Sequence, residues 1–182
     1  NVPADSYYNL EIDQSGSKTA QGTVNALGTL TVQSGATYAI AATTTTVTGA
    51  TDLNGTTTIS TGTLDANGTF DATGSTIDFT GAGRLQVSGA VTSFGSLDAA
   101  AGTVECDGGT QTIPVDYFYN LEIDQSGTKT IAANTIVNGN MTVQAGATVD
   151  FGTGGSVIYG ASDINGTLTM TTGSYDANGS FD

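Results

Sequence analysis

A nine-residue stretch of this chain occurs twice, letter for letter, and this internal repeat constrains the fold more than any other feature. The stretch Tyr8–Gly16 has the sequence YNLEIDQSG, and it returns as Tyr119–Gly127. The same offset, which takes Asn9 to Asn120, then continues without a gap to the end of the chain. A fixed internal period is typical of architectures in which each unit buries its apolar face against the next one. We therefore expect a first long repeat at residues 1–111 and a second, truncated repeat at residues 112–182.

Strand patterns run through both repeats, whereas helix patterns are nearly absent. Short runs alternate apolar and polar side chains between clusters of Gly, Asn, Asp and Ser, and no window has the helical i, i+3, i+4 spacing. Alternation places the apolar side chains on one face of each strand. The predicted core consists of Leu10, Ile12, Leu30, Val32, Ile59, Phe79, Leu121, Ile123, Met141 and Val143.

The spacing of these runs favours a solenoid over separate domains. Corresponding runs recur at intervals of about 22 residues, which suits one coil with two or three short strands. We predict an all-β, parallel β-helix (β-solenoid) with about 22 residues per coil and about five coils per long repeat, wound as one continuous solenoid. The alternative is a tandem of immunoglobulin-like sandwiches, since such domains have about 100 residues. The short runs, the absence of Trp and the lack of a Pro- or Gly-rich linker between the repeats favour the solenoid.

Four Asn-Gly pairs mark turns in either fold. Asn and Gly tolerate positive φ, so we expect these pairs to form tight corners in the left-handed conformation. An Asp precedes each Asn by two residues, and its side chain is expected to cap the amides of the corner. The pairs are Asn54-Gly55, Asn67-Gly68, Asn165-Gly166 and Asn178-Gly179, preceded by Asp52, Asp65, Asp163 and Asp176.

The charge balance excludes several classes of partner. The chain has seventeen carboxylate side chains and three basic side chains, and its formal net charge is −14. Such a chain repels nucleic-acid phosphates and anionic membrane surfaces, so we expect neither partner. The sequence also has no apolar run long enough for membrane insertion. The single cysteine, Cys106, cannot form a disulfide within these residues, and its place beside Val104 in an alternating run predicts a buried thiol.

The repeat resembles a known kind of surface protein. Tyr119–Thr130 has the sequence YNLEIDQSGTKT, Met141–Thr148 has the sequence MTVQAGAT, and Asn165–Thr169 has the sequence NGTLT. These segments are similar to the repeats of large bacterial surface β-solenoid proteins, which are filamentous-adhesin-like and of the type IX-secreted type. The resemblance covers essentially the whole chain. It implies an extracellular stalk or adhesin at the cell surface, and it brings no catalytic residue with it.

Outward carboxylates are the first candidates for chemistry. Two acids separated by one residue on a strand face lie about 7 Å apart, which is close to the spacing of glycosidase acid pairs. A catalytic acid needs a sheltered pocket that raises its pKa, whereas these acids alternate on a flank that we expect to be solvated. Calcium is the only cofactor considered, because stacked acids repel one another and divalent cations would relieve this. The acids are Glu11, Asp13, Asp78, Glu105, Asp107, Glu122 and Asp124.

Threonine runs and aromatic residues are two further candidates. Thr-x-Thr runs begin at Thr29, Thr46, Thr56 and Thr167, and a flat array of such hydroxyls would suit ice binding. Their uneven spacing favours ordinary strand propensity instead. Aromatic residues precede the same strand in each repeat and could stack on sugar rings, although packing against the core is the simpler role. These aromatic residues are Tyr7, Tyr8, Tyr117, Phe118 and Tyr119.

Together these features predict a structural or adhesive segment of a long extracellular protein or filament that acts as a rigid stalk. The chain has no histidine to serve as a base, so we expect no enzyme, no catalytic residues, no metal ligands and no cofactor-binding residues. The alternatives are a carbohydrate-active β-helix enzyme and an ice-binding solenoid. We expect self-association or contact with neighbouring repeats of the same protein, because an end coil leaves strand edges unpaired, and surface glycans are the other partner considered.

Overall fold

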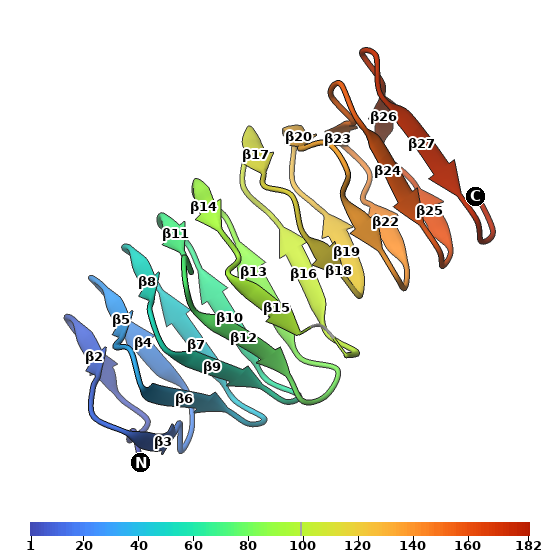
Figure 1. The fold of residues 1–182 in the computed structure, drawn as a ribbon. Helices are drawn as coiled ribbons and strands as arrows, with labels where there is room; N and C mark the ends of the chain where they lie inside the picture. The colour runs from blue at the N-terminus through green and yellow to red at the C-terminus, as the bar shows by residue number, and fades with distance from the viewer. Residues whose placement is uncertain (99) are drawn as a thin grey trace. The chain divides into compact units, whose positions relative to one another are not determined.

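A computed structural model describes residues 1–98 and 100–182, and no helix occurs among them. The strands are two to five residues long and follow one another at short intervals, as Figure 1 shows with their labels. The chain forms two compact units, Asn1–Gly102 and Thr103–Asp182. In each unit the backbone winds through three strands per coil, and each strand pairs with its counterpart in the next coil. The short strands fit a chain in which Gly, Asn and Asp interrupt every alternating run.

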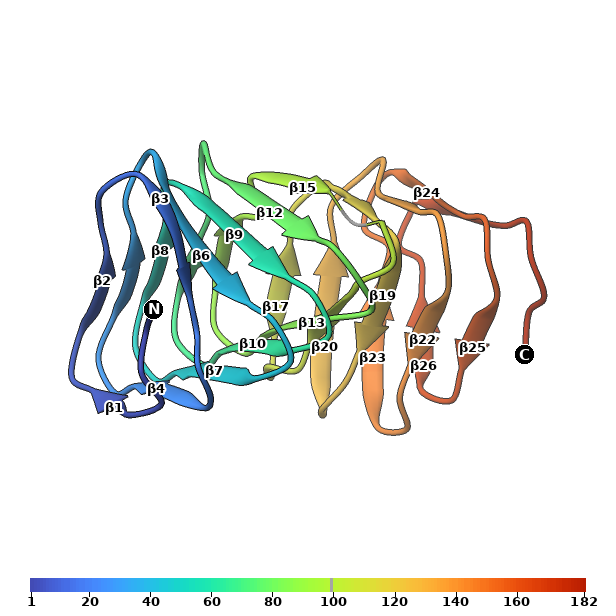
Figure 2. The ribbon, with the colours of Figure 1, turned by 90° about the horizontal axis from the view of Figure 1, so that it is seen from below.

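The first unit has five coils and three parallel sheets among its described residues. Each sheet takes one strand from every coil, so the sheets run along the stack rather than along the chain. The first sheet contains β1 (Ser6–Tyr7), β4 (Val24–Ala26), β7 (Thr44–Val47), β10 (Thr63–Ala66) and β13 (Arg84–Val87). The second contains β2 (Leu10–Ile12), β5 (Leu30–Val32), β8 (Thr51–Leu53), β11 (Phe70–Asp71) and β14 (Val91–Ser93). The third contains β3 (Gly16–Thr19), β6 (Ala36–Ile40), β9 (Thr56–Ile59), β12 (Thr76–Phe79) and β15 (Ser96–Asp98), and Figure 2 shows β3, β6, β9 and β12 side by side.

The second unit repeats this arrangement in four coils. Its first sheet contains β16 (Thr103–Cys106), β19 (Asn120–Ile123), β22 (Met141–Val143) and β25 (Ser162–Ile164). Its second sheet contains β17 (Gln111–Ile113), β20 (Gly127–Ile131), β23 (Ala147–Asp150) and β26 (Thr167–Thr169). Its third sheet contains β18 (Tyr117–Phe118), β21 (Ile136–Val137), β24 (Gly155–Ile158) and β27 (Ser174–Ala177).

The parallel β-solenoid prediction is confirmed for each unit, and the immunoglobulin-like alternative is wrong. Every strand pair with a described register is parallel, whereas a sandwich would be built from antiparallel pairs. The coils are slightly shorter than predicted, and they vary in length. Along the second sheet of the first unit, Leu10 pairs with Leu30, Leu30 with Thr51 and Thr51 with Phe70, so successive steps along the chain are unequal. The bends between strands differ in length, and one strand pair also shifts its register, since Phe70 pairs with Val91 whereas Asp71 pairs with Ser93.

The predicted core is confirmed in full, since all ten of its residues are buried. Inward side chains stack in columns along each unit, such as Ile12 with Val32 in the first and Ile123 with Val143 in the second. Large side chains fill these columns as well, including Tyr38, whose hydroxyl forms a 2.7 Å hydrogen bond with that of Thr45. A buried column of this kind stabilises a coil only through its neighbours, which is the energetic basis of a solenoid.

The two long repeats adopt the same local structure in the two units. The side-chain oxygen of Asn9 accepts the backbone N–H of Thr29 at 3.0 Å, and Asn120 accepts that of Asn140 at 2.9 Å. Gln14 and Gln125 occupy the same positive φ of 59°. These two pairs of identical residues therefore have the same structural roles in the two repeats.

The Asn-Gly corners differ from the prediction. None of the four glycines in these pairs has a positive φ. They lie instead where the backbone of the preceding coil passes very close, so that a Cβ on Gly68 would lie 2.2 Å from the carbonyl oxygen of Gly49. The same contact recurs from coil to coil at one corner of each unit. This glycine ladder consists of Gly28, Gly49, Gly68 and Gly89 in the first unit and Gly139, Gly160 and Gly179 in the second.

We predict that Gly68→Ala lowers the free energy of unfolding by about 1–3 kcal/mol, because the new methyl group can be accommodated only if two coils separate at the corner. Urea denaturation followed by circular dichroism measures the change. Gly109→Ala is the matched control, because a Cβ there meets no atom within 4 Å, and its stability should match that of the unchanged protein. Equal stability of both variants would mean that the corner does not need glycine.

Candidate functional surfaces

One outward face of each unit carries a ladder of hydroxyl groups. In the first unit, the register of β3, β6, β9, β12 and β15 aligns Ser17, Thr37, Thr56, Thr76 and Ser96. In the second unit, the register of β20, β23 and β26 aligns Thr128, Thr148 and Thr167. Successive rungs of such a ladder lie about 4.8 Å apart. We call these two columns the hydroxyl ladders. Each rung of the second unit is the repeat counterpart of a rung of the first.

Sequence reasoning missed these ladders, because it compared the wrong threonine runs. The run that begins at Thr29 extends into β5, the run at Thr46 lies in β7, and the run at Thr56 lies in β9, so the three belong to three different sheets. Their uneven spacing therefore says nothing about any one face. Each ladder takes one Ser or Thr from each successive coil, and this alignment becomes visible only once the register is known.

The column beside each hydroxyl ladder is less uniform. In the first unit it contains Thr19, Ala39, Thr58 and two aspartates, Asp78 and Asp98. In the second unit its members are Thr112, Thr130, Asp150 and Thr169. The face is therefore polar and partly acidic, and none of these aligned residues is aromatic. It offers hydroxyl and methyl groups at regular intervals, but no ring for sugar stacking.

The outward acids of the repeated strand are hydrogen-bonded to the next coil. Gln33 donates its side-chain amide to Glu11 at 2.7 Å, and Gln144 donates to Glu122 at the same distance. Glu11 and Asp13 are exposed, as predicted, and Asp78, Asp107, Glu122 and Asp124 are half-buried. Among the described residues, no group of three or more Asp, Glu, Cys or His side chains is arranged to hold a metal ion. These acids are therefore exposed or half-buried, and Glu11 and Glu122 each have an amide partner in the next coil.

Glu105 is the exception to the exposed acids, and its predicted exposure is wrong. It lies in β16 at 6 % exposure, and its register partner in the next coil is Glu122. Its neighbour Cys106 is fully buried, which confirms the prediction for the thiol. Burial raises the pKa of Cys106, against the opposing charge of Lys129. The thiol consequently stays protonated and does not act as a nucleophile at neutral pH.

Lys129 is a buried residue whose role the sequence did not reveal. Its side chain is completely inaccessible, and its ammonium group donates to the backbone carbonyls of Asp124 and, at 2.8 Å, of Gln125. Its counterpart Lys18 is half-buried in the first coil and donates to the carbonyls of Gln14 and Ser15, both at 3.0 Å. Each lysine thus forms hydrogen bonds with the bend that precedes its own strand, and these bonds stabilise the bend. Burial lowers the pKa of Lys129, while Cys106 and nearby carboxylates oppose this shift.

The aspartates of the Asp-x-Asn-Gly segments form hydrogen bonds within their own segments. Three of the four aspartates accept a hydrogen bond from the side-chain amide of their own Asn, at 3.0 Å for Asp52, 2.9 Å for Asp65 and 2.8 Å for Asp163. We expected the aspartates to cap backbone amides of the corner, so this detail is corrected.

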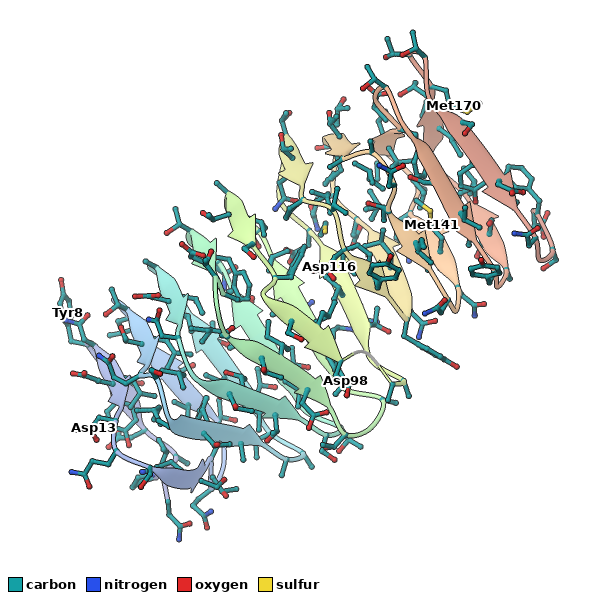
Figure 3. The ribbon with its side chains drawn as sticks, in the orientation of Figure 1. Tyr8, Asp13, Asp98, Asp116, Met141 and Met170 are labelled. Atoms are coloured by element: carbon teal, nitrogen blue, oxygen red, sulfur yellow. The ribbon has the colours of Figure 1, made fainter. Side chains whose placement is uncertain are left out.

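The aromatic residues before the repeated strand divide between packing and exposure. Phe118 is fully buried, and Tyr7 is half-buried with its hydroxyl donating to the carbonyl of Pro3 at 3.1 Å. Tyr8 is 78 % exposed and projects from the first coil in Figure 3, and Tyr117 and Tyr119 are also exposed. Asp116, which the sequence did not single out, caps the backbone N–H of Tyr117 at 2.7 Å. Burial raises the pKa of Asp116, and this hydrogen bond opposes the shift.

Comparison with known proteins finds no matching family model, no similar curated protein and no similar solved structure. Among the described residues, no helix is long and apolar enough to cross a membrane.

We predict that Lys129→Met lowers the free energy of unfolding by about 1–3 kcal/mol, because two backbone carbonyl groups lose a donor that is itself fully buried. Lys18→Met is the matched control, because Lys18 contacts two carbonyl groups of the corresponding bend but is only half-buried, and its replacement should change the stability by no more than about 0.5 kcal/mol. Urea denaturation of the two variants measures the difference. Equal effects would show that the burial of the lysine does not matter to stability.

Proposed function

We propose that this chain is a structural segment of a long extracellular surface protein, where it acts as a rigid stalk. The observation that supports the proposal is the uniform parallel stacking inside each unit, where every coil hydrogen-bonds to its neighbours through three sheets. Such stacking spreads cohesion along an axis and does not concentrate it around a pocket. The similarity of the repeated YNLEIDQSG strand to the repeats of bacterial surface solenoids is consistent with this role.

The charge of the chain suits a crowded cell surface. Fourteen excess negative charges over 182 residues keep neighbouring rods apart through mutual repulsion. The same charge leaves self-association to the ends of the solenoid, where strand edges are unpaired. In this proposal the two long repeats continue one another as one solenoid, and the mechanical role follows from that continuity.

The stalk proposal predicts that length grows in proportion to the number of long repeats. We expect each added copy of residues 1–111 to lengthen the particle by about 27 Å, since one coil of about 20 residues rises about 4.8 Å. Small-angle X-ray scattering of chains with one, two and three copies measures the maximal dimension and the cross-section. A matched series with a flexible Gly-Ser linker between copies provides the comparison for separately folded units. The proposal fails if the directly joined copies are as flexible as the copies that are separated by Gly-Ser linkers.

The hydroxyl ladders favour a second candidate function, the binding of ice. We propose this alternative because a regular array of hydroxyl and methyl groups can hold ordered water across several coils. The array recurs on the counterpart strands of both units, with Ser or Thr at every paired position. The lack of an aromatic residue among the aligned positions makes this face less suited to carbohydrate.

The ice-binding alternative predicts thermal hysteresis that depends on one face only. The double variant Thr37→Lys, Thr56→Lys should abolish it, because the long side chains interrupt two adjacent rungs. The double variant Thr31→Lys, Thr46→Lys is the matched control, since both threonines point outward on other sheets and are equally half-buried. A freezing-point osmometer or a cooled microscope stage measures the effect. Absence of hysteresis in the unchanged protein would eliminate this function.

A further inference from the structure

One interior coil of the first unit has a polar layer in its core. This coil consists of β7, β8 and β9, and each of the three strands directs one threonine into the core. These threonines are Thr45, Thr51 and Thr57, and the side chains of all three are buried. We call them the threonine layer. Because β4, β5 and β6 pair with this coil on one side and β10, β11 and β12 on the other, the layer is enclosed within its unit.

The neighbouring coils carry larger side chains at the same inward positions. The strand register places each threonine of the layer between two apolar or aromatic residues of the adjacent coils. The flanking residues are Val24 and Leu64 for Thr45, Leu30 and Phe70 for Thr51, and Tyr38 and Ile77 for Thr57. Threonine is smaller than all of these residues except valine. The threonine layer therefore fills less of the interior than the layers on both sides of it.

Two of the three hydroxyl groups in the layer have no hydrogen-bond partner within the described part of the chain. The Oγ1 atoms of Thr51 and Thr57 are buried and unbonded, whereas the hydroxyl of Thr45 forms a 2.7 Å hydrogen bond with that of Tyr38. A buried hydroxyl without a partner destabilises the folded state, and most such groups in proteins are paired with protein atoms or with ordered water. Buried water binds where the interior has room and about two to four polar groups are within reach. The threonine layer, with its small side chains and several hydroxyl groups, has these properties.

The second repeat shows the same inward position with a protein partner. Ser162 is the counterpart of Thr51, and its side chain is also buried. The hydroxyl of Ser162 accepts a hydrogen bond from the hydroxyl of Tyr175. In the first repeat the residue that corresponds to Tyr175 is Leu64, whose side chain has no polar atom. Thr51 therefore needs a partner that this position of the chain does not supply.

We propose that the threonine layer encloses ordered water that forms hydrogen bonds with the hydroxyl groups of Thr51 and Thr57. A hydroxyl group both donates and accepts, so each threonine can bond to water in either direction. The paired hydroxyls of Tyr38 and Thr45 add a further polar group to the lining of the same layer. The bound water removes the cost of two unpaired hydroxyls, and the coil therefore keeps its cohesion although its core is polar. This inference does not rest on the proposed stalk function.

A crystal structure of the 182-residue chain, at a resolution that shows ordered solvent, tests the proposal directly. We expect solvent oxygen atoms within about 3.2 Å of the Oγ1 atoms of both Thr51 and Thr57. The double variant Thr51→Val, Thr57→Val should keep the fold and lose these solvent atoms, because valine has the shape of threonine without the hydroxyl group. The proposal is overturned if either hydroxyl group lacks solvent density beside it in the unchanged chain.

Urea denaturation tests the same proposal in solution. Thr51→Val and Thr57→Val should each raise the equilibrium constant for unfolding about fivefold, because the bound water loses a partner. Thr58→Val is the matched control, since Thr58 is half-buried and lies on the outward face of the strand that contains Thr57, and it should change this constant by less than about twofold. Circular dichroism verifies that all three variants fold. A lower unfolding constant in either interior variant would mean that its hydroxyl was unpaired, and this result would also overturn the proposal.

Discussion

The structure depends on the close approach of one coil to the next through parallel backbone ladders. Every apolar column, every Asn-to-amide contact and every cross-coil Gln-to-Glu contact forms between neighbouring coils, so none exists in an isolated coil. The glycine ladder shows how close this approach is, because the carbonyl oxygen of one coil occupies the space that a side chain would take in the next. Cohesion is thus a property of pairs of coils, as expected for a solenoid.

The sequence predicted what depends on local pattern. Alternation alone identified ten residues that are all buried, and the buried thiol of Cys106 followed from its place between Glu105 and Asp107. These predictions succeeded because the side-chain period of a strand is two, whatever the strand pairs with. The solenoid itself was predictable from the short, regularly spaced runs.

The sequence did not predict the role of a residue where that role depends on the register or on a neighbouring coil. Coils of unequal length offset equivalent positions irregularly, so the alignment of Thr37 with Thr56 could not be derived from spacing. Asn-Gly suggested a left-handed turn, although glycine is needed there because Gly49 approaches Gly68 from the next coil. Glu105 alternates like an exposed acid, yet its surroundings bury it. The local sequence around Lys129 did not indicate that its side chain would be buried or that it would donate to the carbonyls of the preceding bend.

The irregular length of the coils has a consequence for how such a protein can diversify. The steps from Leu10 to Leu30, from Leu30 to Thr51 and from Thr51 to Phe70 are unequal, although these partners remain aligned in the same sheet. At these positions the bends gain and lose residues while the paired strands stay aligned, so such a bend is a position where new sequence can be added without disturbing the ladder on either side. Loops that recognise different targets could be grafted at successive levels of one scaffold, each displayed at a fixed height along its unit.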